Sequence, residues 1–190
     1  MKDGDKMNDF PKKKYNIIYV DPPWSYMDKA SAGERGACYK YDLMSMEDIC
    51  NLPVKDIAAD DCCLFMWATM PKLDEIFLWD IFASWGFEYK TNAFTWVKLN
   101  KKKPTWFWGM GRWTRANAEL CLLATKGNPK RLNAGVHSII MHPVMKHSQK
   151  PAIVRDEIVK LCGDLPRIEL FSRNNTEGWD SWGNEVGKYD

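Results

Sequence analysis

The sequence lacks the patterns that mark a structural metal site or a disulfide framework. Its six cysteines include no Cys-x-x-Cys pair, and its three histidines are spaced five residues apart without a cysteine or carboxylate set around them. Zinc sites need closer ligand spacings than these, so no metal site is expected. Cys62, Cys63 and Cys121 lie in apolar runs, which indicates small core residues rather than ligands.

The sequence also lacks a long apolar run and a strong excess of either charge, and we expect no leader peptide. No stretch is apolar enough to cross a bilayer, and we expect a soluble, reduced, cytoplasmic protein without a membrane partner. The formal net charge is only +2, so overall charge does not identify a nucleic-acid-binding protein. The Gly-x-Gly-x-x-Gly loop of nicotinamide-dependent enzymes is absent, which argues against that class.

The length and composition that are present fit one folded domain. The 190 residues are 45% hydrophobic, enough for a full α/β core and too few for two ordinary domains. We therefore expect a single domain over residues 1–190. Residues 1–8 are polar and are expected to form a mobile tail.

The most informative stretch is residues 15–24. Residues 15–20 are rich in β-branched and aromatic side chains and predict a buried strand. Pro22 and Pro23 cannot continue it because they lack N–H donors, so the strand ends at Asp21. Ligands of open α/β sheets bind at this edge. The Asp21 carboxylate and the Pro22 carbonyl can each accept an N–H of an exocyclic amine while Trp24 stacks on the ring, which predicts a nucleobase site. The alternative is an ordinary turn at the end of a strand.

Two long loops are expected. Residues 25–41 have neither a helical nor a strand period, and long loops in compact domains are often functional. Residues 99–116 mix basic residues with aromatics and glycines, a composition that suits contacts to phosphates and stacking on bases. A solvated charged surface is the alternative for any one run of lysines.

Periodicity and capping signals place the remaining elements. Ser45 and Asp48 have the spacing of a capping box, and Pro151 suits the first turn of a helix. Helices are expected over residues 45–52 and 72–85 and from residue 147 onward. Further strands are expected over residues 62–68, 89–98, 117–125, 137–141 and 168–171. The last of these strands runs into a polar turn, as in a cofactor loop at a strand tip.

The tetrapeptide from Asp21 to Trp24 resembles motif IV of the amino methyltransferases. Its Trp variant is similar to the family of the catalytic subunit of the eukaryotic messenger-RNA adenosine N6-methyltransferase and its bacterial and phage relatives. Further motifs of that family follow in order: a Tyr before Met-Ser, Gly-x-Gly-x-Trp, Lys-Gly-Asn-Pro, His-x-Gln-Lys-Pro and Glu-Leu-Phe-x-Arg. Motif IV precedes the cofactor loop, as in the permuted β-class. The resemblance covers residues 15–185 and implies a Rossmann-like α/β fold, a mainly parallel twisted sheet of about seven strands with helices on both faces.

The resemblance implies an S-adenosylmethionine-dependent enzyme that methylates the N6 amine of adenine in nucleic acid. The implied catalytic residues are Asp21, Pro22, Pro23 and Trp24. The implied substrate-binding residues are Tyr39, Tyr41, Lys101, Lys102, Lys103, Trp108, Arg112, Trp113 and Glu119. The implied cofactor-binding residues are Asp9, Phe10, Asp21, Lys150, Phe171, Arg173, Asn175, Asn184 and Glu185.

Several of these roles are more specific. Lys150 is expected to meet the methionyl carboxylate, Phe171 to pack on the cofactor, and Arg173 with Asn175 to bond the ribose hydroxyls. Glu185 stands where the eukaryotic relatives carry Gln, which leaves its contact open. Glu119 touches the base or holds a loop arginine, with a loop-anchoring salt bridge as the alternative.

The implied chemistry needs no covalent enzyme nucleophile. Hydrogen bonds to Asp21 and Pro22 favour a more tetrahedral amine nitrogen, which attacks the methyl group in line, so the site acts by positioning and electrostatics. In a duplex the adenine is flipped out and received by Trp24 and Tyr41. DNA is favoured as the substrate of a compact microbial or phage-like chain, with RNA as the alternative. A silent scaffold is disfavoured because the motif IV acid and the cofactor loop are retained. A homodimer or a partner subunit is left open.

Overall fold

The computed structural model describes residues 9–24, 43–111, 113–146 and 148–188. Within them, seven strands form one sheet in the order β5-β3-β4-β2-β1-β6-β7. The strands are β1 (Tyr15–Val20), β2 (Ala58–Ala68), β3 (Glu88–Leu99), β4 (Ala118–Lys126), β5 (Ile139–Pro143), β6 (Arg167–Leu170) and β7 (Asp180–Trp182). β4 is antiparallel to its neighbours β2 and β3, and every other pair in this sheet is parallel. The expected mainly parallel sheet is confirmed.

β1 lies in the middle of the sheet and sets the position of motif IV. It pairs with β2 on one side and β6 on the other, and Val20 is in register with Met66 and Leu170. The strand is almost wholly buried, as its apolar sequence predicts. Asp21 therefore leaves the sheet at the edge where three parallel strands end.

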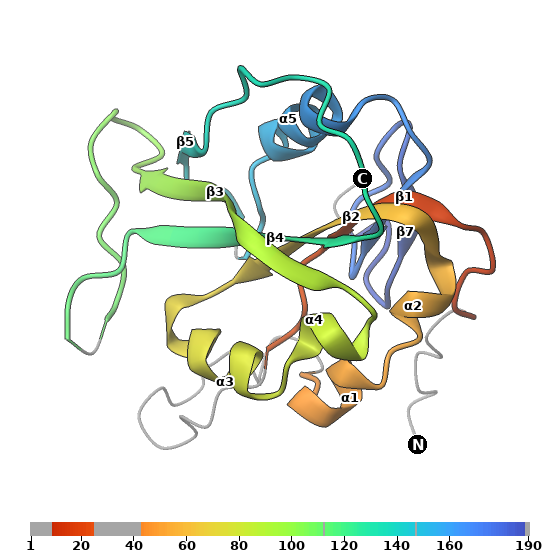
Figure 1. Ribbon diagram of the computed structural model, residues 1–190. Coiled ribbons are helices and arrows are strands. Elements are labelled where there is room, and N and C mark those ends of the chain that lie inside the picture. The colour runs from red at the N-terminus through yellow and green to blue at the C-terminus, as the bar shows by residue number, and fades with distance from the viewer. Residues whose placement is uncertain (1–8, 25–42, 112, 147, 189–190) are drawn as a thin grey trace.

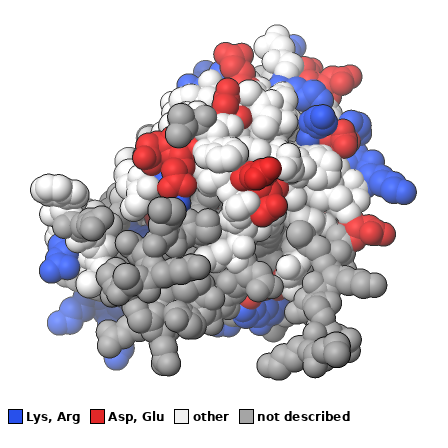
Figure 2. All heavy atoms as spheres, turned by 90° about the horizontal axis from the view of Figure 1, so that it is seen from below, with Lys and Arg blue, Asp and Glu red and all other residues white. Residues whose placement is uncertain are grey.

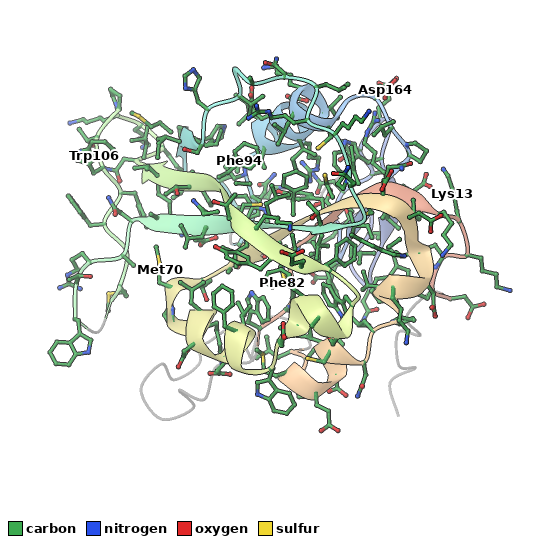
Figure 3. The ribbon with its side chains drawn as sticks, viewed as in Figure 1. Lys13, Met70, Phe82, Phe94, Trp106 and Asp164 are labelled. Carbon is green, nitrogen blue, oxygen red and sulfur yellow. The ribbon has the colours of Figure 1, made fainter. Side chains whose placement is uncertain are left out.

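Helices cover both faces of the sheet (Figure 1). The helices labelled α1 to α4 lie on one face, and α5 covers the other. The bounds are α1 (Met46–Cys50), α2 (Val54–Ile57), η3 (Met70–Lys72), α3 (Leu73–Leu78), α4 (Ile81–Ser84) and α5 (Ile153–Cys162). Each face has its own apolar cluster: Phe82 belongs to the first and Phe94 to the second, and they lie on opposite sides of the sheet (Figure 3). Every helix in the described ranges is too short or too polar to cross a membrane.

The predicted long helix over residues 72–85 is wrong, because the chain breaks it at Asp80. This residue has a left-handed backbone with φ of 45°, which a continuous α-helix excludes. Its carboxylate accepts a hydrogen bond from the Ala83 N–H at 3.3 Å and so caps α4. Asp tolerates this conformation better than most residues because its short side chain bonds locally.

Other boundaries shift by a few residues. The capping box at Ser45 and Asp48 is confirmed, with the Ser45 hydroxyl 3.1 Å from the Asp48 nitrogen, and the helix ends at Cys50. α5 begins later than expected, because Ser148 has a left-handed φ of 57° and Pro151 only precedes the helix. β2 begins four residues before the expected position 62, and β5 two residues after the expected position 137.

Candidate active site

The prolines of motif IV hold Asp21 at the carboxyl end of β1. The Pro22 carbonyl accepts the Trp24 N–H at 2.9 Å, which folds the motif into a tight turn. The Pro23 carbonyl accepts the Met44 N–H at 3.1 Å and ties the turn to the segment before α1. A carbonyl oxygen has two lone pairs, so the Pro22 carbonyl keeps one acceptor position for a ligand.

Asp21 faces the segment that precedes α5. Lys150 Nζ donates to Asp21 Oδ2 at 2.6 Å across 129 sequence positions. The lysine side chain is 11% exposed and the aspartate 25%. This ion pair brings the expected catalytic acid and an expected cofactor residue into direct contact.

A pocket at this edge of the sheet collects residues from both ends of the sequence. Asp21 contributes from β1, Lys150 from the segment before α5, and Phe171 with Arg173 from the turn after β6. The full lining is Asp21, Ser148, Gln149, Lys150, Ala152, Arg155, Glu169, Phe171, Arg173 and Asn174. The structure therefore places the motif IV acid and the expected cofactor turn in one concave site.

Backbone strain is concentrated in the same pocket. Phe171 has φ of 59° and Ser148 has φ of 57°, and both line it. A left-handed residue other than glycine costs about 1–3 kcal/mol, and such positions cluster at functional sites. Behind Phe171 the chain passes so closely that a Cβ at Gly183 would lie 2.9 Å from the Phe171 Cα. The turn after β6 is thus held in one shape by its neighbour after β7.

Burial and charge act against each other at the ion pair. Burial raises the pKa of Asp21, while the charge and hydrogen bond of Lys150 lower it. Burial works to lower the pKa of Lys150, but Asp21 and Glu119 raise that pKa on balance. On balance the pKa of Asp21 is raised, so Lys150 offsets only part of the effect of burial.

Glu119 joins this pair from β4. Lys150 Nζ lies 3.5 Å from Glu119 Oε2, and Lys98 Nζ lies 2.5 Å from Glu119 Oε1. Lys98 stands near the end of β3, at the root of the loop that follows. The geometry is that of a salt bridge at the root of the loop, and no contact from a loop arginine to Glu119 is found in the described part of the chain. Contact with a base stays a prediction.

The expected cofactor residues are partly gathered around this pocket. Arg173 Nε lies 2.8 Å from Glu185 Oε2, so these two form a pair beside it. Asn174 lines the pocket, whereas its neighbour Asn175 and also Asn184 are exposed and are not part of the lining.

Phe10 and Asp9, two expected cofactor-binding residues, lie just before β1. The Phe10 ring packs edge-on against Trp182 with centroids 4.8 Å apart, and Trp182 packs in the same way against Phe171 at 5.4 Å. Asp9 is exposed. Phe10 is thus not part of the pocket lining, and its ring is connected to Phe171 through Trp182.

Sequence reasoning missed a buried charged pair in the pocket. Arg155 on α5 binds Glu169 on β6 with two hydrogen bonds, of 2.7 and 2.9 Å. Burial raises the pKa of Glu169, and Arg155 opposes that shift. A glutamate inside an apolar strand needs a cationic partner, and that rule was the available signal.

The base-stacking residues are the least defined part of the site. Trp24 is 4% exposed and packs in the first apolar cluster, and its indole N–H has no partner among the described residues. Tyr39, Tyr41 and Arg112 lie outside the described residues. Stacking of a base on Trp24 stays a prediction, and it requires the indole to become accessible.

The loop after β3 projects away from the sheet as a ribbon (Figure 1). Trp106 forms a bridge to Leu99, and the Gly109 N–H donates to the Ala116 carbonyl at 2.7 Å. Trp108 and Trp113 are 62% and 96% exposed. Lys101, Lys102 and Lys103 are exposed as well. The loop thus presents cations and aromatic surfaces to solvent, as its composition predicts.

Figure 2 shows the face of the sheet that carries α1 to α4, seen from below. Acidic side chains are visible near its centre and toward its upper margin, and lysines and arginines are visible mainly toward its sides.

Comparison with known proteins identifies one matching family and several relatives. Residues 15–185 match the MT-A70 family. The chain is 38% identical over 194 residues to the type II methyltransferase M.MunI of a Mycoplasma species, covering 93% of this chain and 79% of that protein. It is 28% identical to the human N(6)-adenine-specific methyltransferase METTL4, covering 94% of this chain and 39% of METTL4. It is also 28% identical to the human N(6)-adenosine-methyltransferase catalytic subunit METTL3, covering 91% of this chain and 28% of METTL3. The chain therefore spans less than half the length of these two human relatives.

Proposed function

The chain belongs to the MT-A70 family, and from this premise we propose that it transfers the methyl group of S-adenosylmethionine to the N6 amine of adenine in nucleic acid, with DNA as the preferred substrate. The observation that carries the proposal is the pocket in which Asp21, Lys150, Phe171 and Arg173 meet. Family relatives named as N6-adenine methyltransferases support the reaction.

The residues of the pocket fit this cofactor. S-adenosylmethionine has a carboxylate, an ammonium group, a sulfonium and a ribose diol. The pocket supplies cations from Lys150 and Arg173 and carboxylates from Asp21 and Glu169, so both signs of charge find partners. Lys150 would hold the carboxylate, and Arg173 with Glu185 would hold the ribose hydroxyls.

The catalytic work falls to motif IV. Bound S-adenosylmethionine supplies an electrophilic methyl group. The Asp21 carboxylate and the free lone pair of the Pro22 carbonyl accept the two N–H groups of the amine and orient its nitrogen. Asp21 also stabilises the positive charge that develops on that nitrogen. Neither residue forms a covalent bond, so the site acts by position and charge. As the nitrogen–methyl bond forms and the methyl–sulfur bond breaks, Asp21 can accept the proton that the methylated nitrogen loses and pass it to solvent.

DNA is preferred because the relative at 38% identity carries the type II designation, which is used for site-specific DNA methyltransferases. RNA is the second candidate, and a specific observation favours it. A relative at 29% identity is named an N6-methyladenosine RNA methyltransferase. The exposed lysines and tryptophans of the loop after β3 suit a strand of either kind. METTL3 is named as a catalytic subunit, so a second subunit is also considered.

The decisive experiment follows tritiated methyl groups from S-adenosylmethionine into duplex DNA, single-stranded DNA and RNA oligonucleotides. Nucleoside mass spectrometry then identifies the modified base. We expect N6-methyladenine in DNA, with the Asp21→Asn variant as the inactive control. Methylation of RNA alone would replace DNA by the second candidate. Absence of transfer to every oligonucleotide, with sedimentation showing a homogeneous folded protein, would contradict the proposed activity of the isolated chain.

A further inference from the structure

Four charged side chains of alternating sign lead from the pocket to the root of the loop after β3. Asp21 pairs with Lys150 at 2.6 Å, Lys150 lies 3.5 Å from Glu119, and Glu119 pairs with Lys98 at 2.5 Å. They come from the end of β1, the segment before α5, β4 and β3. We refer to Asp21, Lys150, Glu119 and Lys98 as the charge quartet.

Both lysines of the quartet lie over tryptophan rings. Lys150 Nζ is 5.5 Å from the Trp67 ring centroid, and Lys98 Nζ is 5.0 Å from that of Trp96. The two rings pack edge-on with centroids 6.3 Å apart. The aromatic faces hold the ammonium groups over the sheet, where the lysine side chains are only 11% and 20% exposed. Burial works to lower the pKa of Lys150, so this lysine depends on the carboxylates beside it for its charge.

The proposed reaction creates a conflict at Asp21. Its carboxylate has to accept the amine of adenine, yet Lys150 occupies Oδ2. The sulfonium of the cofactor and the nitrogen that attacks it both carry positive charge during transfer. The methionyl carboxylate that Lys150 would hold is already balanced by the cofactor's own ammonium group. Without a second protein carboxylate, the charge of Lys150 would therefore oppose the sulfonium, since like charges repel strongly where water is scarce.

We infer that Glu119 is a positioning residue that acts through Lys150. Glu119 offers the lysine a second counter-ion, so that Asp21 can turn to the base. The quartet then stays neutral beside a cationic cofactor. The inference rests on the proposed function and extends it. Two lysines and two carboxylates sum to zero charge, so the quartet adds no repulsion to the sulfonium. Lys150 already touches Glu119, so it shifts from one carboxylate to the other without an unpaired buried stage.

The state of Glu119 agrees with this role. Burial works to raise the pKa of Glu119, but Lys150 and Lys98 lower it on balance, so the carboxylate is ionised at neutral pH. Lys98 keeps the net charge of the quartet at zero, because without it the two carboxylates would outnumber the single lysine.

The test compares two ligands that differ in charge. S-adenosylhomocysteine lacks the methyl group and the sulfonium charge of S-adenosylmethionine but has the same remaining groups. Glu119→Gln removes one charge at nearly constant shape, and the double variant Lys98→Met with Glu119→Gln returns the quartet to neutrality. Calorimetry measures both affinities in each protein, and single-turnover kinetics with DNA measures the transfer step.

For Glu119→Gln we expect the affinity for S-adenosylmethionine to fall about three- to tenfold, because the variant leaves one extra positive charge several ångströms from the sulfonium. The affinity for S-adenosylhomocysteine, which has no sulfonium charge, should stay within about twofold. Single-turnover transfer should fall by at least about tenfold. The double variant should restore the affinity ratio of the two ligands. Glu119→Asp, which keeps the charge, should preserve that ratio.

The contrary outcomes are distinct. An equal fall of both affinities in Glu119→Gln would show a merely structural role and overturn the inference, as would a double variant that fails to restore the ratio. If the wild-type protein transfers methyl groups and Glu119→Gln matches it in every measurement, only this inference fails. If the wild type binds neither ligand and transfers no methyl group, the proposed function fails with it.

Discussion

Asp21 has to be buried and charged at the same time. Burial raises its pKa because water no longer solvates the carboxylate, and Lys150 offsets part of that rise by direct contact. A carboxylate held in this way is a strong acceptor for an amine, since little solvent competes with it. The chemistry of the site therefore depends on one ion pair between residues 129 positions apart.

Replacing Asp21 tests the assignment of the acceptor. Asp21→Ala should lower the turnover number by at least about 100-fold, the usual effect when a group that stabilises developing charge is removed. The affinity for S-adenosylmethionine should change much less, because Lys150 and Arg173 are retained. Radiometric turnover and calorimetry measure the two effects, with Asp74→Asn on the exposed side of α3 as the control. Retained turnover in Asp21→Ala would remove this residue from the mechanism.

The pH dependence of turnover follows from the same residue. Only the ionised form of Asp21 is a full hydrogen-bond acceptor for the amine, so turnover should fall as pH falls through the pKa of Asp21. Burial raises that pKa, so the midpoint of the acid limb should lie above the ordinary aspartate value of about 3.9. Turnover at saturating substrates between pH 4 and 8 gives the midpoint. A midpoint at or below the ordinary value would show that another group controls the limb.

At the residue scale, the sequence identifies residues of the site more readily than it identifies the residues that they contact. Asp21 could be placed from two prolines after a buried strand, since two consecutive prolines cannot continue an interior strand. The contact with Lys150 could not be placed without the resemblance, because it depends on how β1 and the segment before α5 meet. The pair of Arg155 and Glu169 was missed for the same reason.

At the scale of elements, hydrophobic periodicity located the helices and strands but did not predict a local change of backbone conformation. The apolar pattern of residues 72–85 is helical on both sides of Asp80, so the pattern alone could not reveal the break. The break depends on one left-handed residue whose side chain caps the next helix. By contrast, β1 was predicted at its observed bounds, because a short apolar run followed by two prolines leaves little choice.

The break at Asp80 gives a prediction about stability. Asp80→Ala removes the cap of α4 and places alanine in a left-handed conformation, so the free energy of unfolding should fall by about 1–3 kcal/mol. Asp80→Asn should cost less, because asparagine caps helices and tolerates this backbone. Urea denaturation of the three proteins measures the difference. A gain in stability in Asp80→Ala would indicate that the two helices prefer to merge.

The loop after β3 gives a prediction about substrate binding. Replacing Lys101, Lys102 and Lys103 by Ala should weaken nucleic-acid binding for all sequences alike. The slope of log affinity against log salt should flatten by about 0.9 for each phosphate that the variant no longer neutralises. Fluorescence anisotropy at several salt concentrations measures both effects. The affinity for S-adenosylmethionine should not change, because none of the three lysines lines the pocket.

A matched control lies at the other end of β1. Lys12, Lys13 and Lys14 are also three consecutive exposed lysines, but they precede the strand that Asp21 follows. Their replacement should leave the salt slope unchanged. If the loop variant keeps the wild-type slope and instead shifts the oligomeric state in sedimentation, the loop contacts a second subunit rather than phosphates.

At the scale of the whole molecule, the mainly parallel sheet was predictable, and the order of its strands was not. A buried strand has the same apolar sequence whichever strands flank it, so the antiparallel β4 between β2 and β3 leaves no local signal. The resemblance implied the class of fold, since several motifs occur in the right order. The order of the strands matters for function because it places β1 between β2 and β6, which brings the motif IV acid to the cofactor turn.

The pocket joins segments from the beginning and the end of the chain, so the ligand it holds should stabilise the whole fold. A ligand that binds only the folded state at 100 times its dissociation constant adds about 2.7 kcal/mol. For a chain of this size, that corresponds to a rise in Tm of about 5–11 °C. Differential scanning calorimetry with and without S-adenosylmethionine measures the rise. Lys150→Ala and Arg173→Ala should abolish most of it, because each removes a cation from the pocket.

The control for this measurement is Lys160→Ala, which removes an exposed cation on α5. Among the described residues Lys160 forms an ion pair only with Glu157, and it does not line the pocket. The rise in Tm of this variant should equal that of the wild type, since a surface ion pair contributes little. Equal rises in all four proteins would place the binding site elsewhere. A rise that disappears in Lys150→Ala and Arg173→Ala but persists in Lys160→Ala would tie the stability of the whole sheet to the edge where β1 and β6 end.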